Sequence, residues 1–198
     1  MLVVGLGNPG AEYEQTPHNL GFLALERFAL RNGIRITRPE CQALVGLGTV
    51  GGKAVVVAKP QTLMNRSGDS VKLLMQKYES ALGDLLVVYD ELAFPWGQMR
   101  LLPKGSAGGH NGATSVIQQV GSTGFARLRI GCNPGQGPFH KGAGADFLLS
   151  PIRRELRGEL DLMLDQAAGA IESVIAEGAE KAMTKVNRRA GSEKDKEA

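Results

Sequence analysis

Apolar residues in the first half of the chain gather in short, nearly continuous runs, separated by glycine-rich or polar segments. Four such runs, made mostly of valine and leucine, occupy residues 1–6, 43–47, 53–58 and 85–89. Continuous aliphatic runs predict strands that are buried on both faces, as in the centre of an α/β sheet. The turn at Gly51-Gly52, between the second and third runs, predicts a hairpin.

Segments with apolar residues at helical spacing alternate with these strands. Helices are predicted at 16–32, at 67–78, at 110–121 and from a Ser150 cap with Pro151 in the first turn, the last one breaking near Gly178. The alternation predicts one α/β domain over 1–190, with a mixed, twisted sheet flanked by helices. The charged residues 191–198 are expected to form a disordered tail.

Further strands are predicted at 98–102, at 126–130 and, short and basic, near 34–36. Arg127 and Arg129 should share one face of their strand, because strand side chains repeat every two residues. The glycine-rich segments 103–109 and 133–144 lack periodicity and are predicted to be surface loops that can close over a ligand.

Composition narrows the classes of partner and compartment. The 198 residues carry a formal charge of +3, which permits a polyanionic partner without requiring one. Cys41 and Cys132 lack metal-ligand spacing and are expected to stay reduced. The chain opens directly on strand residues and has no apolar run long enough to span a bilayer, so a cytoplasmic location without membrane attachment is expected.

The first predicted strand leads into a G-x-G-x-x-G pattern at residues 5–10, which matches the dinucleotide-binding signature letter for letter. A dinucleotide site needs a helix that begins inside the glycine turn and an acid at the end of the next strand. Here Pro9 removes an amide from the turn, the best helix start is Thr16-Pro17, and that acid is missing. We therefore interpret the glycines as room for a turn that sets Asn8 beside His18.

Polar side chains gather where the predicted strands end and the helices start. They are Asn8, His18, Asn65, Asp90, His110 and Asn111. A nearby aspartate fixes the tautomer of a histidine, and the positive end of a helix disfavours the imidazolium, so His18 with Asp90 predicts a neutral base. Neither a Gly-x-Ser-x-Gly nor a His-Glu-x-x-His motif is present, so a water activated by His18 is the simplest chemistry.

Each of these residues taken alone also has a structural explanation. A histidine at a helix start, an aspartate after a strand and an asparagine before Ser67-Gly68 are all common in capping and turn structures. Met64 and Leu63 are residue types that more often fill cores. The combination carries the functional interpretation.

Six segments carry a longer match. They are Val4 to Gly10 with Tyr13, Thr16-x-His18-Asn19-x-Gly21, Lys59-Pro60-x-Thr62-x-Met64-Asn65-x-Ser67-Gly68, Asp90-Glu91-Leu92 with Pro95 and Gly97, Gly108 to Gly112, and Phe125-x-Arg127-Leu128-Arg129-Ile130-Gly131. In this order and spacing the chain closely resembles the bacterial-type peptidyl-tRNA hydrolase family.

The resemblance implies a monomeric mixed-sheet enzyme that cleaves the ester between a peptide and the terminal ribose of tRNA, without metal or cofactor. By motif position His18 corresponds to the catalytic base and Asp90 to its supporting carboxylate. Asn8 matches the residue associated with telling peptidyl-tRNA from free aminoacyl-tRNA. Contacts to substrate or tRNA are expected from Tyr13, Leu63, Met64, Asn65, His110 and Asn111.

An RNA substrate agrees with the basic residues near the predicted site. Arg100 and Lys104 flank the glycine-rich loop and Arg129 lies on the next strand, so phosphate contacts are expected from these three. The chain departs from the family pattern at Pro17, usually basic, at Leu63, usually aromatic, and at Ala93, usually acidic.

Two rival functions remain open at the level of sequence. Plant organelle splicing factors resemble this family and bind RNA without hydrolysis, and a nucleotide-dependent oxidoreductase is the third interpretation.

Overall fold

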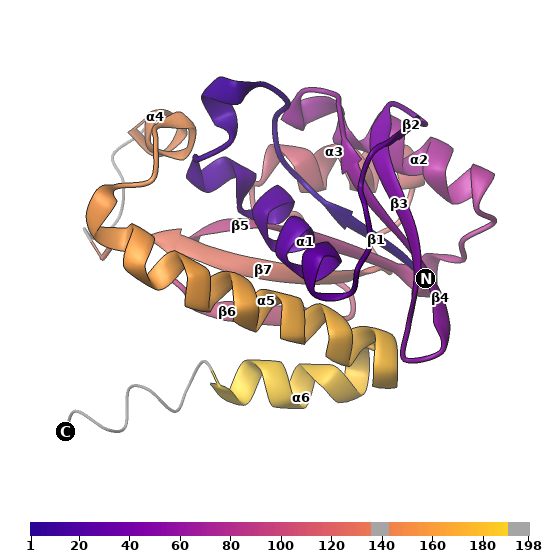
Figure 1. The fold of residues 1–198 in the computed structure, drawn as a ribbon. Coiled ribbons are helices and arrows are strands. Elements are labelled where there is room, and N and C mark those ends of the chain that lie inside the picture. The colour runs from indigo at the N-terminus through magenta and orange to yellow at the C-terminus, as the bar shows by residue number, and fades with distance from the viewer. Residues whose placement is uncertain (136–142, 190–198) are drawn as a thin grey trace.

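A seven-stranded sheet runs through the molecule in the order β2-β3-β4-β1-β5-β7-β6 (Figure 1). The computed structural model describes residues 1–135 and 143–189. Its strands are β1 (Leu2–Gly5), β2 (Arg38–Glu40), β3 (Ala43–Val50), β4 (Lys53–Pro60), β5 (Leu85–Pro95), β6 (Met99–Leu102) and β7 (Ala126–Asn133). Pairs β1-β4, β1-β5 and β5-β7 are parallel, whereas β2-β3, β3-β4 and β6-β7 are antiparallel. The predicted mixed sheet and its β3-β4 hairpin are confirmed.

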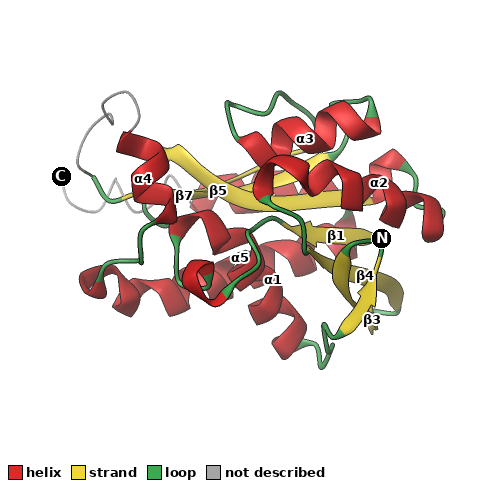
Figure 2. Ribbon diagram, turned by 90° about the horizontal axis from the view of Figure 1, so that it is seen from above, coloured by secondary structure: helices red, strands yellow, loops and turns green. Residues whose placement is uncertain are grey.

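Helices cover both faces of the sheet (Figure 2). The helices α1 (Leu20–Arg31) and α5 (Arg157–Glu177) lie on one face, and α2 (Ser67–Lys77) and α3 (Asn111–Val120) lie on the other. Two more helices, α4 (Ala143–Leu149) and α6 (Ala179–Arg189), contact the Pro17–Asn19 turn and the edge strand β6, respectively. No helix of the described residues is long and apolar enough to cross a membrane.

Aliphatic runs build the central strands because each strand has to fill two cores. Side chains alternate between the faces of a strand. Val3 and Leu86 accordingly pack beneath α1 and α5, whereas their neighbours Val4 and Val87 pack beneath α2 and α3. The continuous valine and leucine pattern is thus a direct consequence of helices on both sides.

Helix α1 lies very close to β1, and glycines make this approach possible. A Cβ added at Gly5 would lie closer than 3.0 Å to the carbonyl of Gly21, and one added at Gly7 equally close to the ring of Phe22. Only Gly10 of the three opening glycines has a positive φ, of 121°. The prediction that all three serve the turn is therefore wrong for Gly5 and Gly7, which serve close packing.

The chain near 34–36 is not a strand, and the edge strand β2 begins later, at Arg38. Ile34 is buried, and its side chain fills the space beside Gly46 and Gly48 of β3. Its backbone amide donates to the carbonyl of Ala29 and so closes the end of α1. Core filling by one isoleucine therefore displaces the predicted strand.

The last long helix also starts later than predicted. Ser150 does not cap it but donates to the carbonyl of Asp146 at the end of α4. Residues 151–153 form neither helix nor strand, and buried Ile152 is anchored there by a hydrogen bond from its backbone amide to the carbonyl of Gln15. The helix begins at Arg157, and its predicted break at Gly178 is confirmed.

Two other predictions concern element ends. The helix predicted from residue 16 starts as a short 3₁₀ turn, Pro17–Asn19, before α1. The helix predicted to end at Gly121 does so, with Gly121 in the left-handed conformation. Residues 136–142 of the predicted loop 133–144, and the predicted tail 191–198, lie outside the described residues, and α4 begins at Ala143 within that loop. The single domain over 1–190 stays a prediction.

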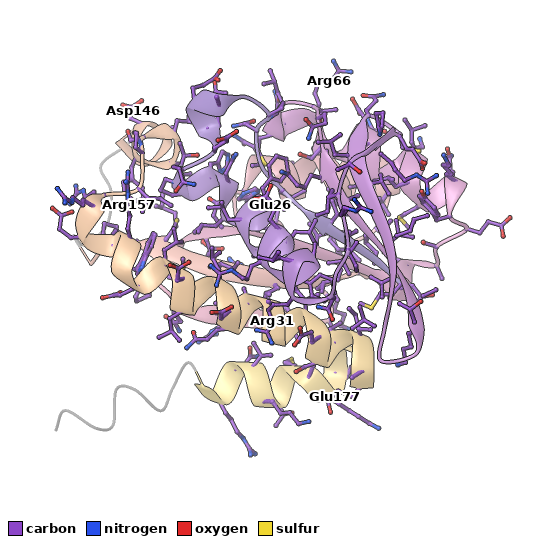
Figure 3. All side chains as sticks on the ribbon, in the orientation of Figure 1. Glu26, Arg31, Arg66, Asp146, Arg157 and Glu177 are labelled. Atoms are coloured by element: carbon purple, nitrogen blue, oxygen red, sulfur yellow. The ribbon has the colours of Figure 1, made fainter. Side chains whose placement is uncertain are left out.

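Ion pairs orient α5 on α1 along their exposed sides. Arg27 pairs with Asp161 and Asp165, and Arg31, labelled in Figure 3, pairs with Glu172. Pairs with this degree of exposure contribute little to stability, so the buried apolar contacts between the helices dominate.

The contact between β1 and α1 predicts a strong effect of a single methyl group. Gly21→Ala would place a Cβ against the backbone of Val88 and Leu6, which cannot move aside without separating the helix from the sheet. We expect the free energy of unfolding to fall by roughly 1–3 kcal/mol or more, measured by urea denaturation.

Gly158→Ala is the matched control, because Gly158 lies in α5 with open space around its Cα. We expect it to raise stability by roughly 0.5–1 kcal/mol. Equal effects of the two substitutions would contradict the packing explanation.

Candidate active site

Three neighbouring parallel strands deliver polar groups to one edge of the sheet. Strands β4, β1 and β5 point the same way, so their carboxyl ends meet there. Asn8 follows β1, Met64 follows β4, and Asp90 lies in β5 just before its pairing with β7 becomes irregular. This is the edge at which open α/β sheets bind ligands.

His18 and Asp90 meet at this edge, as predicted. His18 lies in the turn before α1, and its Nδ1 is 3.0 and 3.1 Å from the two carboxylate oxygens of Asp90. Asp90 is 1 % exposed and His18 is 8 % exposed. The pair is therefore almost completely shielded from water.

A second histidine contacts the same carboxylate. The Nε2 atom of His110, the residue that precedes α3, lies 2.9 Å from Asp90 Oδ1. The other ring nitrogen of His110 accepts a hydrogen bond from the backbone amide of Ala113, at 3.2 Å. The side chain of His110 is 7 % exposed, so it supports Asp90 in this structure and offers little surface to a substrate.

These contacts assign the protons of both rings. His110 Nδ1 accepts a hydrogen bond, so the proton of the neutral ring is on Nε2 and is donated to Asp90. An ionised Asp90 only accepts, so His18 donates its Nδ1 proton as well. In the neutral ring the second nitrogen of His18, Nε2, then carries no proton and can accept one.

Asp90 remains ionised at neutral pH in these surroundings. Burial alone would raise its pKa, but His110 and His18, which donate to the carboxylate, hold the pKa well below its ordinary value. The carboxylate keeps its negative charge and so stabilises any positive charge that forms on His18.

Asn8 is held in place by its backbone and by its side-chain oxygen. The side chain of Asn19 accepts from the Asn8 amide at 2.8 Å and donates to the Asn8 carbonyl at 3.0 Å. The Asn8 Oδ1 atom accepts from the backbone amide of Met64 at 2.8 Å. Within the described residues its Nδ2 group makes no hydrogen bond, so this group is the one left to donate to a ligand.

His18, Asp90 and His110 also have the composition of a metal site. Among the described residues, one possible ligand atom from each lies within 4.8 Å of the other two. The hydrogen-bond pattern, however, places a proton on both nitrogens that face Asp90. A metal ion would have to displace both protons, and the three side chains already satisfy one another without it.

Comparison with known proteins decides the family. The family model described as peptidyl-tRNA hydrolase matches residues 2–196. The peptidyl-tRNA hydrolase of Solibacter usitatus is 50 % identical over 197 residues, which cover 100 % of this chain and 99 % of that protein. The chain belongs to the peptidyl-tRNA hydrolase family.

Other members agree. The peptidyl-tRNA hydrolase of Koribacter versatilis is 44 % identical over 189 residues, covering 95 % of this chain and 92 % of that protein. A crystal structure of the peptidyl-tRNA hydrolase from Acinetobacter baumannii superimposes with a TM-score of 0.85 at 34 % identity, covering 94 % of this chain and 93 % of that one. The predicted family and fold class are confirmed.

The residues expected to contact substrate in this family member fall into two groups. The first group is exposed and forms what we call the rim of the site: Leu63, which is 58 % exposed, Asn65 and Asn111. Tyr13 is half-buried. Met64 differs, because it is buried and packs against Gly112 while its amide holds Asn8. The structure thus places Met64 as a support for Asn8.

The three basic residues expected to contact phosphate differ in how free they are. Arg100 and Lys104 are exposed. Arg129 instead donates through Nε to Glu91, at 2.7 Å, and forms an ion pair with it. The guanidinium groups of Arg100 and Arg129 lie over the ring of Phe94, at 5.4 and 4.9 Å from its centroid. A phosphate would therefore have to compete with Glu91 for Arg129.

The role of Asn19 and the hydrogen bond between His110 and Asp90 were not predicted from the sequence. Asn19 directly follows His18 in one of the matched segments, and that position was the available signal. Its role was hidden because a side chain that bonds a backbone 11 residues earlier leaves no periodic trace in sequence.

The clamp on Asn8 predicts the behaviour of Asn19→Ala. The variant loses both hydrogen bonds to the Asn8 backbone, so we expect a stability loss of roughly 1–3 kcal/mol and a clear drop in turnover, because Asn8 is released. Chemical denaturation and hydrolysis assays measure the two effects.

Asn32→Ala is the control for Asn19→Ala. Asn32 makes two side-chain hydrogen bonds, to Phe28 and Glu172, at the far end of α1. It should lose stability and keep its turnover, and an equal loss of turnover in both variants would refute the clamp.

Proposed function

We propose that the protein hydrolyses the ester bond between the peptide and tRNA in peptidyl-tRNA, with His18 as the general base. The observation that carries this proposal is the pair of His18 and Asp90, which leaves His18 Nε2 unprotonated at the ligand-binding edge of the sheet. Membership of the family supports it independently.

The proposed reaction begins with a water molecule beside His18. As the water oxygen attacks the ester carbonyl carbon, Nε2 of His18 takes one water proton, and the carbonyl oxygen becomes an oxyanion. The tetrahedral intermediate then collapses, the bond to the ribose oxygen of tRNA breaks, and this oxygen takes from Nε2 the proton that came from the water. The products are a free carboxylic acid and tRNA with its terminal hydroxyl restored.

Asp90 acts through His18 in this scheme. Its carboxylate holds the Nδ1 proton, which keeps Nε2 available, and stabilises the imidazolium while the proton is on the ring. His110 supports the carboxylate from the other side. A general base contributes roughly 10²–10⁴-fold in rate, so stabilisation of the oxyanion has to supply the rest.

Asn8 is the best-placed donor for the developing negative charge or for the peptide carbonyl. Its oxygen is bound to the Met64 amide, and its backbone is clamped by Asn19, so the direction of its Nδ2 group is fixed in advance. The exposed Asn65 and Asn111, together with Tyr13 and Leu63, are proposed to contact the acceptor end of the substrate around it.

Substitution of the two central residues tests the mechanism. With N-acetyl-aminoacyl-tRNA as substrate, His18→Ala should lower turnover by roughly 10²–10⁴-fold. Asp90→Asn should also lower it strongly, because an amide can donate to Nδ1 and so move the ring proton to Nε2. tRNA affinity, measured by filter binding, should change little in both.

Asp84 is an exposed aspartate in the turn before β5, so Asp84→Asn is the control. It should have the turnover and the tRNA affinity of the parent. If the parent protein binds tRNA but does not release the blocked amino acid, the chain is an RNA-binding protein on this scaffold. A defect of Asp90→Asn confined to affinity would refute its proposed role.

Phosphate contacts by Arg100 and Lys104 predict a specific salt dependence. Affinity for tRNA should fall steeply with salt, and Arg100→Gln or Lys104→Gln should each reduce the slope of log K against log salt by about 1. Arg35→Gln removes the same charge beyond the far end of α1 and should leave the slope unchanged. An equal change in all three variants would indicate a general charge effect.

A monomeric state and a cytoplasmic location complete the proposal, and both remain predictions.

A further inference from the structure

Arg127, in β7, is a charged residue that the proposed mechanism does not use. It is 0 % exposed. Its guanidinium donates to the carbonyl of Ser106 at 2.7 Å, to that of Thr123 at 3.0 Å and, at 3.5 Å, to that of Phe125. It also lies over the ring of Phe125, 4.4 Å from the centroid.

This burial is costly for the fold. The nearby carboxylate of Glu91 pairs with Arg129, and among the described residues no carboxylate forms an ion pair with Arg127. The Nε atom of Arg127 is buried without a hydrogen bond. Burial accordingly lowers the pKa of Arg127. Backbone carbonyls compensate only part of the lost hydration of a cation, and an apolar side chain would be cheaper for stability alone. The cation therefore needs another explanation.

The carbonyls that Arg127 binds lie on either side of α3. Ser106 belongs to the loop before the helix, and Thr123 belongs to the loop after it. The Thr123 carbonyl also accepts from the amide of Gly105, at 3.2 Å. One planar guanidinium thus ties both loops together.

Two residues of the candidate site, His110 and Asn111, lie at the start of α3. His110 donates its backbone amide to Ala107, one residue after Ser106, and its ring to Asp90. Its ring also contacts that of buried Tyr89, at 4.7 Å between centroids. Burial raises the pKa of Tyr89 and the positive charge of Arg127 beside it opposes this. Arg127 is therefore connected to His110 in two ways. The first is the loop from Ser106 to His110, and the second is the ring of Tyr89, which lies between them.

We propose that Arg127 is a positioning residue for hydrolysis: by holding the loops around α3 it sets His110 against Asp90 and places Asn111 at the rim. Arg127 touches no reacting group. The inference rests on the proposed function of the His18 and Asp90 pair.

Two substitutions in the full chain test this role. Arg127→Lys keeps the positive charge but loses the planar fork that reaches two loops, and Arg127→Met removes the charge with a similar length. We expect kcat for N-acetyl-aminoacyl-tRNA to fall roughly 10- to 100-fold in both, with little change in KM. Because Arg127→Met risks failing to fold, Arg127→Lys carries the test.

The control is a second cation that holds backbone carbonyls. Lys53 Nζ donates to Ile175 at 2.7 Å and to Ala176 at 2.9 Å, at the end of α5 away from the site. Lys53→Met should lose stability and retain kcat. If Arg127 served stability alone, Arg127→Lys and Lys53→Met would both lose stability and both retain kcat.

A spectroscopic readout separates positioning from loss of folded protein. In NMR spectra of the parent, the ring N–H protons of His18 and His110 that bind Asp90 should appear far downfield. The His110 signal should shift or broaden in Arg127→Lys and remain in Lys53→Met.

Parent-like kcat in Arg127→Lys, or a fall in kcat with an unchanged His110 signal, would overturn the inference. His18→Ala, measured alongside, distinguishes this failure from failure of the proposed function, because only the latter leaves His18→Ala as active as the parent.

Discussion

The buried carboxylate of Asp90 is the group on which the rest of the site depends. It lies in the buried part of β5, where an ionised side chain is tolerated only if donors surround it. His18 and His110 supply those donors from two different loops. Ionised Asp90 then selects the tautomer of His18. The tautomer of His110 is set by the backbone amide of Ala113, which donates to its Nδ1. One negative charge thus aligns groups from β5, from the turn before α1 and from the start of α3.

This alignment is possible only because the backbones approach closely. Gly5 and Gly21 let α1 lie against β1, and Gly68 lets α2 lie against Ser115 of α3, whose hydroxyl accepts from the Gly68 amide at 2.9 Å. The first contact sets the distance from His18 to Asp90, and the second ties the turn that holds Met64 to the helix that follows His110. A methyl group at any of these glycines would act on the site through the scaffold.

Local patterns made the fold and half of the site predictable. Aliphatic runs marked β1, β4 and β5, a polar residue at a predicted helix start marked His18, and an acid after a predicted strand marked Asp90, although 72 residues separate the two. Contacts that leave no local pattern were not predictable: the bond from His110 to Asp90, the clamp of Asn19 on Asn8, and the packing role of Gly5. The false strand near 34–36 has the same origin, because the space that Ile34 fills is created by glycines of another strand. Tertiary context overrides propensity at such points.

Arg127 and Arg129 show how position along a strand decides the fate of a charge. Both lie on the face beneath α2 and α3, since they pair with Val87 and Tyr89 of that core. Arg129 is two residues nearer the carboxyl end of β7, where it pairs with Glu91 of β5. Arg127 is deeper and fully buried, where its guanidinium donates to backbone carbonyls and lies over the ring of Phe125. Identical residues two positions apart therefore differ in their surroundings: Arg129 is neutralised by a carboxylate and partly exposed, whereas Arg127 is buried and held by the loops on either side of α3.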